Sequence, residues 1–351
     1  MGIHVCIDAR LFQATGIGTL LKAALTSLSE SQRFKLTLLG LKKDIEQLSF
    51  FGCDLVEMDI PIYTVKEQIF YPQKIPTCDL FWSPHFNVPL LPIKAKKRVV
   101  TVCDVYHLAY FSTLSLSQKV YAKIMYNAAF YLSDLVTTIS EFSKEQIGRF
   151  ATLKPGPITV VSPGFDHFKT TITQSKREHL LFVGNLKPHK NIARLLHAYA
   201  LLAPPEPLLL AGALDKGGDL INIVEKSCFL KQNVHFLGPV STDQLHELYQ
   251  SSKVFLFPSL YEGFGYPPLE AMAFGCPVVA AQAGSIPEVC QDAVQYVDPL
   301  SIESIAEGIA HVLNNEKRSE ELSRKGKELF EKKRGQKNLI GDVFDACCHS
   351  S

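Results

Sequence analysis

The sequence lacks long hydrophobic runs, a charge excess of either sign and any regular spacing of cysteines. Because no apolar stretch reaches the ~18 residues of a membrane-spanning helix, we expect no transmembrane segment. The 351 residues carry a net charge of +1, which argues against nucleic acid as a partner. A strand-like run begins at residue 3, so we also expect no signal peptide. The composition is that of an ordinary globular protein, and the chain is long enough for about two domains of roughly 100–200 residues each.

The nine cysteines are odd in number and include no Cys-x-x-Cys pair. Cys6, Cys103, Cys276 and Cys290 lie inside apolar stretches, which is typical of small buried side chains rather than of disulfides or metal ligands. We therefore expect a reducing compartment and a cytoplasmic location.

The densest basic cluster, residues 94–98, is interpreted as a solvated lead-in to the strand that follows it. The alternative is contact with the anionic inner face of a membrane, which would make the chain a peripheral membrane protein. That contact needs more positive charge than this cluster supplies alone.

Short β-rich runs alternate with longer helical periods along the first half of the chain. In the helical period at 114–134, Val120, Ile124, Ala128 and Tyr131 recur at helical spacing and indicate an apolar face. The series predicts a parallel sheet with helices on both faces. Its strands are expected at 3–9, 34–41, 80–85, 98–105 and 135–140, and a first helix at 19–28.

The same alternation restarts after residue 159, and the polar, patternless stretch 167–178 is the expected domain junction. We predict strands at 179–185, 207–213, 234–238, 253–259 and 277–281, and helices at 191–202, 241–252, 301–315 and 316–334. The fold class is therefore α/β, with two Rossmann-like, doubly wound domains. Sheets of this kind bind ligands beyond the carboxyl ends of their strands, so a cleft between the two domains is the expected site. The expected domains are residues 1–165, residues 166–330 and a C-terminal tail, 331–351, that packs back on the first domain.

The stretch YEGFGYPPLEAMAFGCPVVA, residues 261–280, holds two carboxylates eight positions apart, Glu262 and Glu270. Two prolines between them break any continuous helix, so Glu262 is placed in a loop and Glu270 in the first turn of the next helix. The loop residues Gly263, Phe264 and Gly265 precede that helix, and a glycine turn at a helix N-terminus favours anions. Carboxylates beside such a turn suit hydroxyl groups, so the stretch describes a pocket for a sugar joined to a nucleotide by phosphates. Either glutamate alone would be interpreted as a surface acid. The two together with the glycine loop are interpreted as a binding pocket.

Lysines follow the strand at 179–185. Lys187 and Lys190 lie in the loop between that strand and the next helix, beside Asn185, where an ammonium group could neutralise a pyrophosphate. A solvated loop lysine is the commoner fate of any one such residue. The position at a strand end favours function for Lys190.

Further polar groups follow strands of the first domain. Gly16 and Gly18 open a helix, although a lone Gly-x-Gly is often only a tight turn. The remaining groups are expected at the same edge of the sheet because each follows a predicted strand. They are His85, Asn87, Asp104 and His107.

These motifs together resemble those of retaining nucleotide-sugar glycosyltransferases of family 4, which have the GT-B fold. The similarity rests on EGFGYPPLE for the family's E-x7-E signature, GNLKPHKNIARLL for its lysine loop and helix, and AGSIPEVCQDAVQYVDP for the stretch after the signature. ISEFSKEQI and SPGFD resemble the end of its first domain and the start of its second. The chain looks closest to the mannosyltransferase-like group that builds surface polysaccharides.

The resemblance implies a role for each matching residue. Glu262 is expected near the donor sugar and the reacting centre, Glu270 at the nucleotide ribose, and Lys190 at the donor phosphates. Gly16 and Gly18 match the glycine loop at the pyrophosphate. Ser285 and Ile286 fall in the segment near the base.

Two departures from the family pattern matter. Asn185 stands where many relatives have arginine, so Lys187 is expected to share the phosphate charge. Cys103 stands where many relatives have a histidine beside the transferred sugar. Asp104 remains, and His107 is the nearest substitute. His85, Asn87 and Cys103 are expected on the acceptor side.

The implied reaction transfers a hexose, with mannose favoured, from a nucleotide diphosphate sugar to a saccharide or lipid-linked acceptor. No Asp-x-Asp triplet occurs in the chain, so we expect no metal and no cofactor. Two alternatives stay open: a catalytically impaired GT-B-like protein that binds a sugar nucleotide or a partner, for which Cys103 is the motive, and a GT-B-like sugar-nucleotide epimerase.

Overall fold

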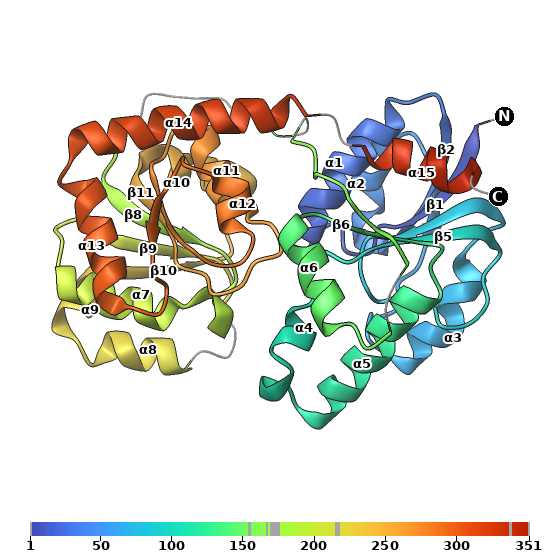
Figure 1. Cartoon of the computed structure of the whole chain (residues 1–351), viewed down its shortest axis with the longest axis horizontal. Helices are drawn as coiled ribbons and strands as arrows, with labels where there is room; N and C mark the ends of the chain where they lie inside the picture. The colour runs from blue at the N-terminus through green and yellow to red at the C-terminus, as the bar shows by residue number, and fades with distance from the viewer. Residues whose placement is uncertain are drawn as a thin grey trace. The chain divides into compact units, whose positions relative to one another are not determined.

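The computed structural model describes residues 2–153, 156–165, 168, 176–214, 218–336 and 339–349. The chain divides into two compact units. The N-terminal unit holds Met1–Phe168 together with Arg334–Ser351, and the C-terminal unit holds Lys169–Lys333. Figure 1 shows that each unit has its own sheet flanked by helices. Most of the predicted junction lies outside the described residues.

The N-terminal unit is built on a parallel sheet whose described strands run in the order β3-β2-β1-β4-β5-β6-β7. The strands are β1 (Ile3–Asp8), β2 (Phe34–Gly40), β3 (Asp54–Glu57), β4 (Cys78–Ser83), β5 (Ala95–Thr101), β6 (Leu135–Thr138) and β7 (Ile158–Val160). The helices are α1 (Ile17–Ser29), η1 (Lys42–Asp44), α2 (Ile45–Ser49), α3 (Val65–Lys74), α4 (Tyr106–Ala109), η2 (Phe111–Thr113), α5 (Leu116–Tyr131), α6 (Glu141–Phe150) and α15 (Ile340–His349).

The C-terminal unit repeats this design, with its described strands in the order β10-β9-β8-β11-β12-β13. The strands are β8 (His179–Val183), β9 (Leu208–Ala211), β10 (Val234–Gly238), β11 (Ser252–Phe257), β12 (Val278–Ala281) and β13 (Gln295–Val297). The helices are η3 (Pro188–Lys190), α7 (Ile192–Leu202), α8 (Gly218–Glu225), α9 (Cys228–Asn233), α10 (Thr242–Ser251), α11 (Tyr266–Ala273), α12 (Ile286–Cys290), α13 (Ile302–Leu313) and α14 (Glu316–Arg334). The two strand orders confirm the prediction of two doubly wound α/β units.

Local chemistry explains where several helices begin. Ser115 and Ser241 each form a capping box, with Gln118 and Gln244 respectively, at the starts of α5 and α10. Near-continuous apolar runs such as that of β11 form the central strands because both faces of a parallel sheet are covered by helices.

Helix α15, the last helix of the chain, packs on α1, β4 and β5 of the N-terminal unit.

The strand order places a topological switch point in each sheet. In the N-terminal unit it lies between β1 and β4, and in the C-terminal unit between β8 and β11. At such a point the loops that follow the two strands turn to opposite faces and leave a crevice for a ligand. The candidate site residues can be sought at these two places.

Three predictions of local structure are wrong. Strand β5 ends at Thr101, so Cys103 and Asp104 lie in a loop rather than in the strand. Helix α11 already begins at Tyr266, and Glu270 therefore lies in its second turn rather than its first. Three of the four residues of the predicted apolar face of α5, Val120, Ile124 and Tyr131, are exposed, and only Ala128 packs against the core. The buried face is instead formed by Ala122, Met125, Tyr126, Ala129 and Phe130.

No helix in the described part of the chain is long and apolar enough to cross a membrane.

Candidate active site

Lys190 and Glu262 meet at the switch point of the C-terminal unit. Lys190 comes from the loop after β8 and Glu262 from the loop after β11, and the lysine Nζ lies 2.6 Å from the glutamate Oε1. Their side chains are 15% and 13% exposed, so each charge has lost most of its water. The ammonium group also lies 5.4 Å from the ring centre of Phe257, the last residue of β11. Two of the predicted catalytic groups are therefore held together.

Asn191 ties these two loops to each other. It adopts a left-handed conformation with φ 61° at the junction of η3 and α7. Its buried side-chain amide donates to the Pro258 carbonyl at 3.1 Å and to the Pro299 carbonyl at 2.7 Å. Asparagine tolerates this conformation better than most residues. The loop that carries Lys190 is consequently fixed to the loop that carries Glu262.

The glycine loop is held from behind by α12. The Ser285 hydroxyl donates to the carbonyls of Glu262 at 3.0 Å and Phe264 at 2.7 Å. Gly265 has φ 106°, and a Cβ there would lie 2.6 Å from Cδ1 of Ile286. Ser285 and Ile286 are both fully buried. Their side chains therefore shape the loop from behind; the predicted contact with a nucleotide base stays a prediction.

Glu270 is oriented by a buried tyrosine. The Tyr249 hydroxyl, from α10, donates to Glu270 Oε2 at 2.9 Å. Burial raises the pKa of the Tyr249 phenol well above its usual range, and the nearby Glu270 carboxylate adds to this effect. The phenol is therefore a dependable donor, and it fixes one carboxylate oxygen of Glu270.

The other predicted donor residues lie around this pair with different exposures. Lys187 is exposed, and Asn185 is half-buried in the same loop. Phe264 is 6% exposed and packs against Tyr266, with ring centres 5.2 Å apart. Gly263 is buried beside Phe264.

A buried ionic cluster occupies the switch point of the N-terminal unit. Arg10 lies between two carboxylates, with Nη2 2.8 Å from Asp8 Oδ2 and Nη1 2.7 Å from Glu67 Oε1. The Tyr71 hydroxyl also donates to Asp8. Burial acts to raise the pKa of Asp8, but the Arg10 charge and these hydrogen bonds hold it below its usual value. Asp8 is the last residue of β1, and Glu67 lies in the first turn of α3.

His85 and Asn87 join this cluster after β4. Asn87 Nδ2 donates to Glu67 Oε1 at 2.7 Å, and its backbone N–H donates to His85 Nδ1 at 3.2 Å. The Tyr63 ring packs edge-on against His85, and its hydroxyl lies 3.4 Å from Nε2. Burial lowers the pKa of His85 to about 3, so the imidazole is neutral at ordinary pH. A neutral imidazole beside a phenol offers hydrogen bonds to hydroxyl groups.

The two glycines that begin α1 differ in what they require. Gly16 has φ 66°, and nothing lies within 4 Å of where its Cβ would be. A Cβ at Gly18 would lie 2.4 Å from the carbonyl oxygen of Phe12. The close approach of its own loop therefore explains Gly18 without a ligand, whereas Gly16 faces open space.

Cys103 and Asp104 lie between β5 and α4, and His107 lies within α4. The Asp104 carboxylate accepts from the Tyr106 backbone N–H at 2.8 Å and so fixes the start of α4. Burial raises the pKa of the Cys103 thiol to about 12, which keeps it protonated. The His107 ring packs 5.6 Å from that of Phe86. Cys103 is thus a neutral thiol next to a helix that carries His107 in its first turn.

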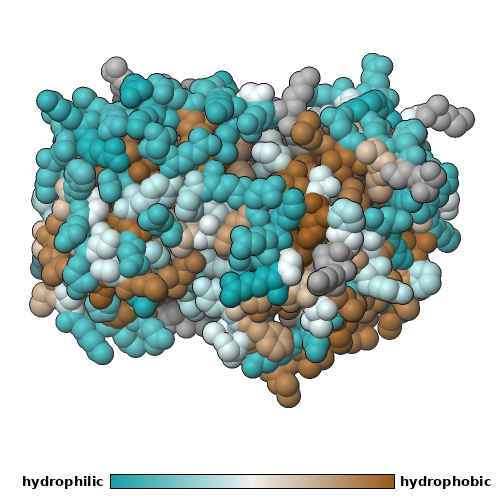
Figure 2. Space-filling view, in the orientation of Figure 1, coloured by the Kyte–Doolittle hydropathy of each residue, from teal (hydrophilic) through white to brown (hydrophobic). Residues whose placement is uncertain are grey.

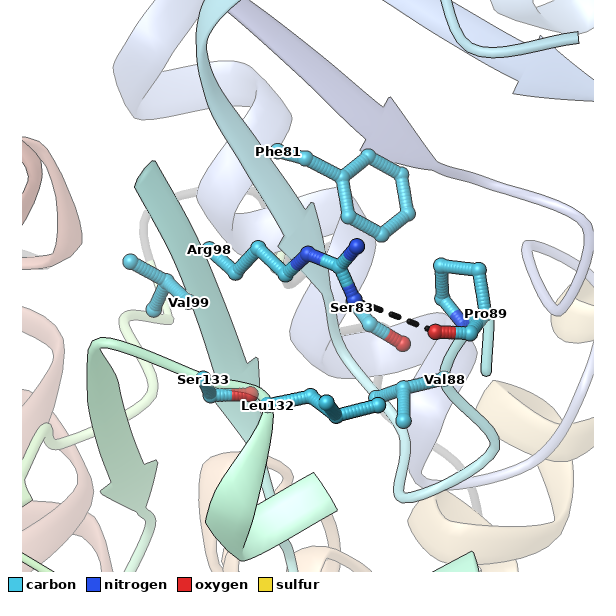
Figure 3. A pocket seen from close by; sticks show the side chains of 8 residues that line it. All are labelled: Phe81, Ser83, Val88, Pro89, Arg98, Val99, Leu132 and Ser133. Atoms are coloured by element: carbon cyan, nitrogen blue, oxygen red, sulfur yellow. Dashed lines mark hydrogen bonds between the residues drawn. The ribbon is translucent and has the colours of Figure 1, made fainter. Parts of the chain in front are cut away.

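The basic cluster at 94–98 is largely partnered. Lys96 pairs with Asp79 at 2.8 Å and Lys97 with Asp134 at 3.5 Å. Arg98 donates to the Pro89 carbonyl at 3.1 Å across a small internal cavity, shown in Figure 3. That cavity holds about 10 Å³, room for one water molecule, so it is no substrate site. The membrane interpretation of this cluster gains nothing from the structure.

Sequence reasoning missed several residues of both sites. Asp8 and Arg10 could have been found, because they lie at the carboxyl end of the first predicted strand, 3–9, of a parallel sheet. Glu67 and Tyr249 could not have been found in this way, because each lies within a helix and not at a strand end. Their partners, Arg10 and Glu270, lie in other elements of the chain.

Comparison with known proteins finds that the chain is similar to several glycosyltransferases. The family model described as "Glycosyl transferases group 1" matches residues 165–329. The chain is 30% identical over 257 residues to O-antigen chain mannosyltransferase B of Escherichia coli, which covers 67% of this chain and 65% of that protein. It is 29% identical over 221 residues to O-antigen chain mannosyltransferase RfbU of Salmonella typhimurium, covering 63% of this chain and 61% of that protein. The chain thus spans less than two thirds of the length of these relatives.

Solved structures match the whole chain. Anabaena HepE, in complex with UDP and glucose, superposes with a TM-score of 0.77 at 16% identity over 98% of this chain and all of that one. WaaG, a glycosyltransferase involved in lipopolysaccharide biosynthesis, gives a TM-score of 0.74 at 14% identity over 99% of this chain and all of that one. These matches confirm the predicted GT-B fold, and the sequence relatives support the prediction of a glycosyltransferase.

Proposed function

We propose that this chain, which carries a group 1 glycosyl transferase domain, is a retaining glycosyltransferase that moves a hexose from a nucleotide diphosphate sugar to an acceptor hydroxyl. Mannose is the favoured sugar, because the curated relatives are named mannosyltransferases. The acceptor is a saccharide or a lipid-linked saccharide. One observation carries the proposal: the Lys190–Glu262 pair at the carboxyl edge of a doubly wound sheet. Glu270, on the helix that follows the loop of Glu262, is oriented by Tyr249.

The proposed reaction exchanges one C–O bond for another at the anomeric carbon. The bond to the donor phosphate breaks, a bond to the acceptor oxygen forms on the same face, and the acceptor proton passes to the leaving phosphate. Negative charge builds on that phosphate in the transition state, and a fixed ammonium group stabilises it. Lys190 fits this role because it is mostly buried and cannot be solvated freely.

The two glutamates are assigned to hydroxyl groups. A carboxylate only accepts hydrogen bonds when it is ionised, so it suits sugar and ribose hydroxyls rather than phosphate. We assign Glu262 to the donor sugar, because it already touches Lys190. Glu270 is assigned to the ribose, with Tyr249 fixing its orientation.

The N-terminal unit is assigned to the acceptor. Its switch point presents Tyr63, His85 and Asn87 above a buried cluster that holds their backbone in place. Tyr63 is 48% exposed, and a half-exposed aromatic ring beside hydrogen-bonding groups suits the apolar face of a sugar.

The leaving-group site is proposed to work without a metal. The ground for this is the sequence, which contains no Asp-x-Asp triplet. Lys190 would then carry the charge that a divalent cation supplies in other sites.

A thermal-shift screen of nucleotide sugars tests the proposal and identifies the donor. A ligand at 100 times its dissociation constant adds about 2.7 kcal/mol to the stability of the folded state. We expect one guanosine or uridine diphosphate sugar to stand out, and transfer from it to saccharide acceptors to follow. A screen in which no nucleotide sugar raises the melting temperature would contradict the proposal.

Cys103 motivates a second candidate, a protein that binds a sugar nucleotide without transferring it. Binding of a donor with no transfer to any acceptor tested would favour that candidate. Conversion of the donor in the absence of any acceptor would instead indicate an epimerase.

A further inference from the structure

Glu67 is the centre of the buried cluster in the N-terminal unit, next to the side chains of Tyr63 and His85, which we call the acceptor subsite. Its own side chain is fully buried. Oε1 accepts from Asn87 Nδ2 at 2.7 Å and lies 2.7 Å from Arg10 Nη1, and Oε2 accepts from the Tyr63 backbone N–H at 2.8 Å. Both carboxylate oxygens are therefore used inside the protein, so Glu67 acts on a ligand only through the groups that it holds.

The backbone of Tyr63 is strained. Its φ is 66°, a left-handed conformation that is rare for a bulky residue. Packing of the core does not require this conformation, because the Tyr63 ring is 48% exposed. The Glu67 carboxylate holds the N–H of Tyr63, and such strain persists where the surrounding structure enforces it, often at ligand sites. As a consequence, the Tyr63 ring lies edge-on against His85, with ring centres 5.8 Å apart.

Asn87 is held in one orientation by partners on both sides. Because an ionised carboxylate only accepts hydrogen bonds, the NH2 group of Asn87 faces Glu67 and its Oδ1 faces the Tyr121 hydroxyl, which donates to it. Asn87 is buried, so water does not compete for these groups. With the side chain fixed, the Asn87 backbone N–H stays where it donates to His85 Nδ1, at 3.2 Å.

The surroundings of these hydrogen bonds are apolar. Glu67 lies on α3 and Tyr121 on α5, and Figure 2 shows hydrophobic residues gathered along the lower margin of this unit, where Figure 1 places both helices. A donor that faces another donor is costly in such surroundings. The network therefore keeps a single pattern of donors and acceptors.

This pattern decides which nitrogen of His85 carries the proton. A backbone N–H can only donate, so Nδ1 is the acceptor and the proton of the neutral imidazole lies on Nε2. Burial lowers the pKa of His85 to about 3, so the neutral form persists at ordinary pH. Nε2 lies 3.4 Å from the Tyr63 hydroxyl oxygen, which therefore accepts from the imidazole and keeps its own proton for a ligand. That separation is long for a hydrogen bond, so Nε2–H can be shared with a ligand oxygen as well.

A subsite made of donors selects a ligand oxygen that accepts. Two carboxylates, Asp8 and Glu67, and one guanidinium, Arg10, give the cluster a net negative charge that disfavours an anionic ligand. The reacting hydroxyl is a poor occupant too, because a donor on its lone pair weakens the nucleophile and Nε2–H cannot take up its proton. We propose that Glu67 is a positioning residue that holds His85 and Tyr63 as donors to a neutral, non-reacting oxygen of the acceptor sugar. The inference rests on the proposed function, since that function makes the bound sugar an acceptor.

Nitrogen-15 NMR of the full-length chain tests the donor pattern without any transfer. The signals of His85 are assigned by their loss in His85→Gln. At neutral pH we expect wild-type His85 to carry its proton on Nε2 alone. Mannotriose, the probe saccharide, should shift the Nε2 signal, and inorganic phosphate should not.

Two variants test the positioning role. Glu67→Gln introduces an amide donor opposite the N–H groups of Asn87 or Tyr63, and so should let both tautomers of His85 appear. It should raise the KM for mannotriose about tenfold, the effect of roughly two lost hydrogen bonds, with kcat and the donor KM within about twofold of the wild type. Tyr121→Phe removes only the hydrogen bond to Asn87 Oδ1 and keeps the ion pair of Glu67, so it should raise the same KM about threefold even if Glu67→Gln fails to fold.

The matched control is a carboxylate on the strand that leads to His85. Asp79, at the start of β4, accepts from the His4 backbone N–H at 2.9 Å and pairs with Lys96. Asp79→Asn should leave the His85 signals and the KM for mannotriose unchanged.

Four outcomes would overturn the proposal. His85 could carry its proton on Nδ1 or be charged at neutral pH, or mannotriose could fail to shift its Nε2 signal while phosphate shifts it. Glu67→Gln and Tyr121→Phe could leave the tautomer and the KM unchanged, or Asp79→Asn could alter them as strongly. A wild type that shows the expected signals and their response to mannotriose but no transfer would contradict the proposed function and support the donor pattern.

Discussion

Lys190 Nζ lies 2.6 Å from Glu262 Oε1, although the two residues are 72 positions apart in the chain. The pair joins the loops after β8 and β11, the two strands at the centre of the C-terminal sheet. In the proposed reaction the phosphates of the donor bring a second negative charge to the same ammonium group. Substitutions of the two residues should therefore have similar effects on transfer but different effects on the binding of the diphosphate.

Replacement of either residue should abolish most of the transfer activity. Lys190→Ala and Glu262→Gln should each lower kcat by about 10²–10³, because each removes a contact that stabilises charge in the transition state. Only Lys190→Ala should also weaken binding of the nucleoside diphosphate, since Glu262→Gln leaves the ammonium group without a competing carboxylate. Single-turnover kinetics and calorimetry with the diphosphate measure the two effects.

The matched control is an ion pair of the same unit at the opposite end of the sheet. Lys253 Nζ lies 2.5 Å from Glu206 Oε1, and neither residue is near the proposed site. Lys253→Ala and Glu206→Gln should leave transfer within about twofold of the wild type. If they impair it as much as the Lys190 and Glu262 variants do, general destabilisation explains the loss and the assignment fails.

The hydroxyl of Tyr249 should matter for donor binding more than for chemistry. Tyr249→Phe keeps the ring but removes the hydrogen bond that orients Glu270. Hydrogen bonds to charged groups contribute about 1.5–3 kcal/mol, so we expect the donor KM to rise roughly tenfold with little change in kcat. Tyr199→Phe is the control, because that hydroxyl is also buried and donates to the Glu206 carbonyl at 2.6 Å. A fall in kcat at unchanged KM would contradict a positioning role.

His85 should make the N-terminal unit sensitive to acid. Burial lowers the pKa of its imidazole to about 3, with Asp8 opposing the shift and His107 and Arg10 adding to it. The unfolded chain has an ordinary histidine pKa of about 6.5, so below that pH it binds a proton that the folded chain does not. Stability is therefore present above about pH 6.5 and is lost as the pH falls toward 3.

Unfolding in urea measures this effect. At about pH 5 the loss due to His85 should be roughly 2 kcal/mol relative to about pH 7, and His85→Gln should lack it. Burial also lowers the pKa of His179, but that contribution is common to both proteins and cancels in the comparison. An equal acid sensitivity of the two proteins would show that His85 is solvated.

The meeting of Lys190 and Glu262 follows from the sequence because strand-end position alone brings their loops to one edge of a parallel sheet. Helix contacts carry no such signal. Nothing in the spacing of Tyr249 and Glu270 indicates that a phenol from α10 reaches a carboxylate on α11. The network of Arg10 and Glu67 was missed for the same reason.

Helix α5 shows a second limit of sequence patterns. Its apolar residues occupy both faces, so periodicity identifies the helix but does not decide which face is buried. The face with Val120 and Ile124 has the more regular spacing of apolar residues. The face that is buried is nevertheless the one with Ala122 and Ala129, whose small side chains allow close packing.

Transfer activity should survive exhaustive removal of divalent cations. The proposal assigns the charge on the leaving phosphate to Lys190, so no cation is needed to neutralise it. The measurement is transfer after dialysis against a chelator, with Mg²⁺ or Mn²⁺ added back to a parallel sample. Loss of activity on chelation with full recovery on addition of either metal would show that the leaving-group site has been misassigned.

The last prediction concerns Cys103, a position at which the resemblance to family 4 glycosyltransferases leads us to expect histidine. Burial raises the pKa of its thiol to about 12, so the thiol offers only a weak, neutral hydrogen bond. The loop that follows is fixed by Asp104, which accepts from the Tyr106 backbone and so begins α4. His107 lies in the first turn of that helix and is the nearest imidazole in sequence that could contact the sugar instead.

If His107 has taken over this contact, His107→Ala should lower transfer by about 10²-fold, in the range expected for a positioned acid or base. Cys103→Ala should then change transfer by less than about threefold, since a neutral thiol contributes little. Transfer by the wild type, both alanine variants and Cys103→His, with one verified donor, decides the matter. A severe defect confined to Cys103→Ala would make the thiol itself functional, because no neighbouring imidazole would then replace it. A gain of activity in Cys103→His, from a wild type that only binds donor, would instead identify the chain as a binding protein that lost its catalytic histidine.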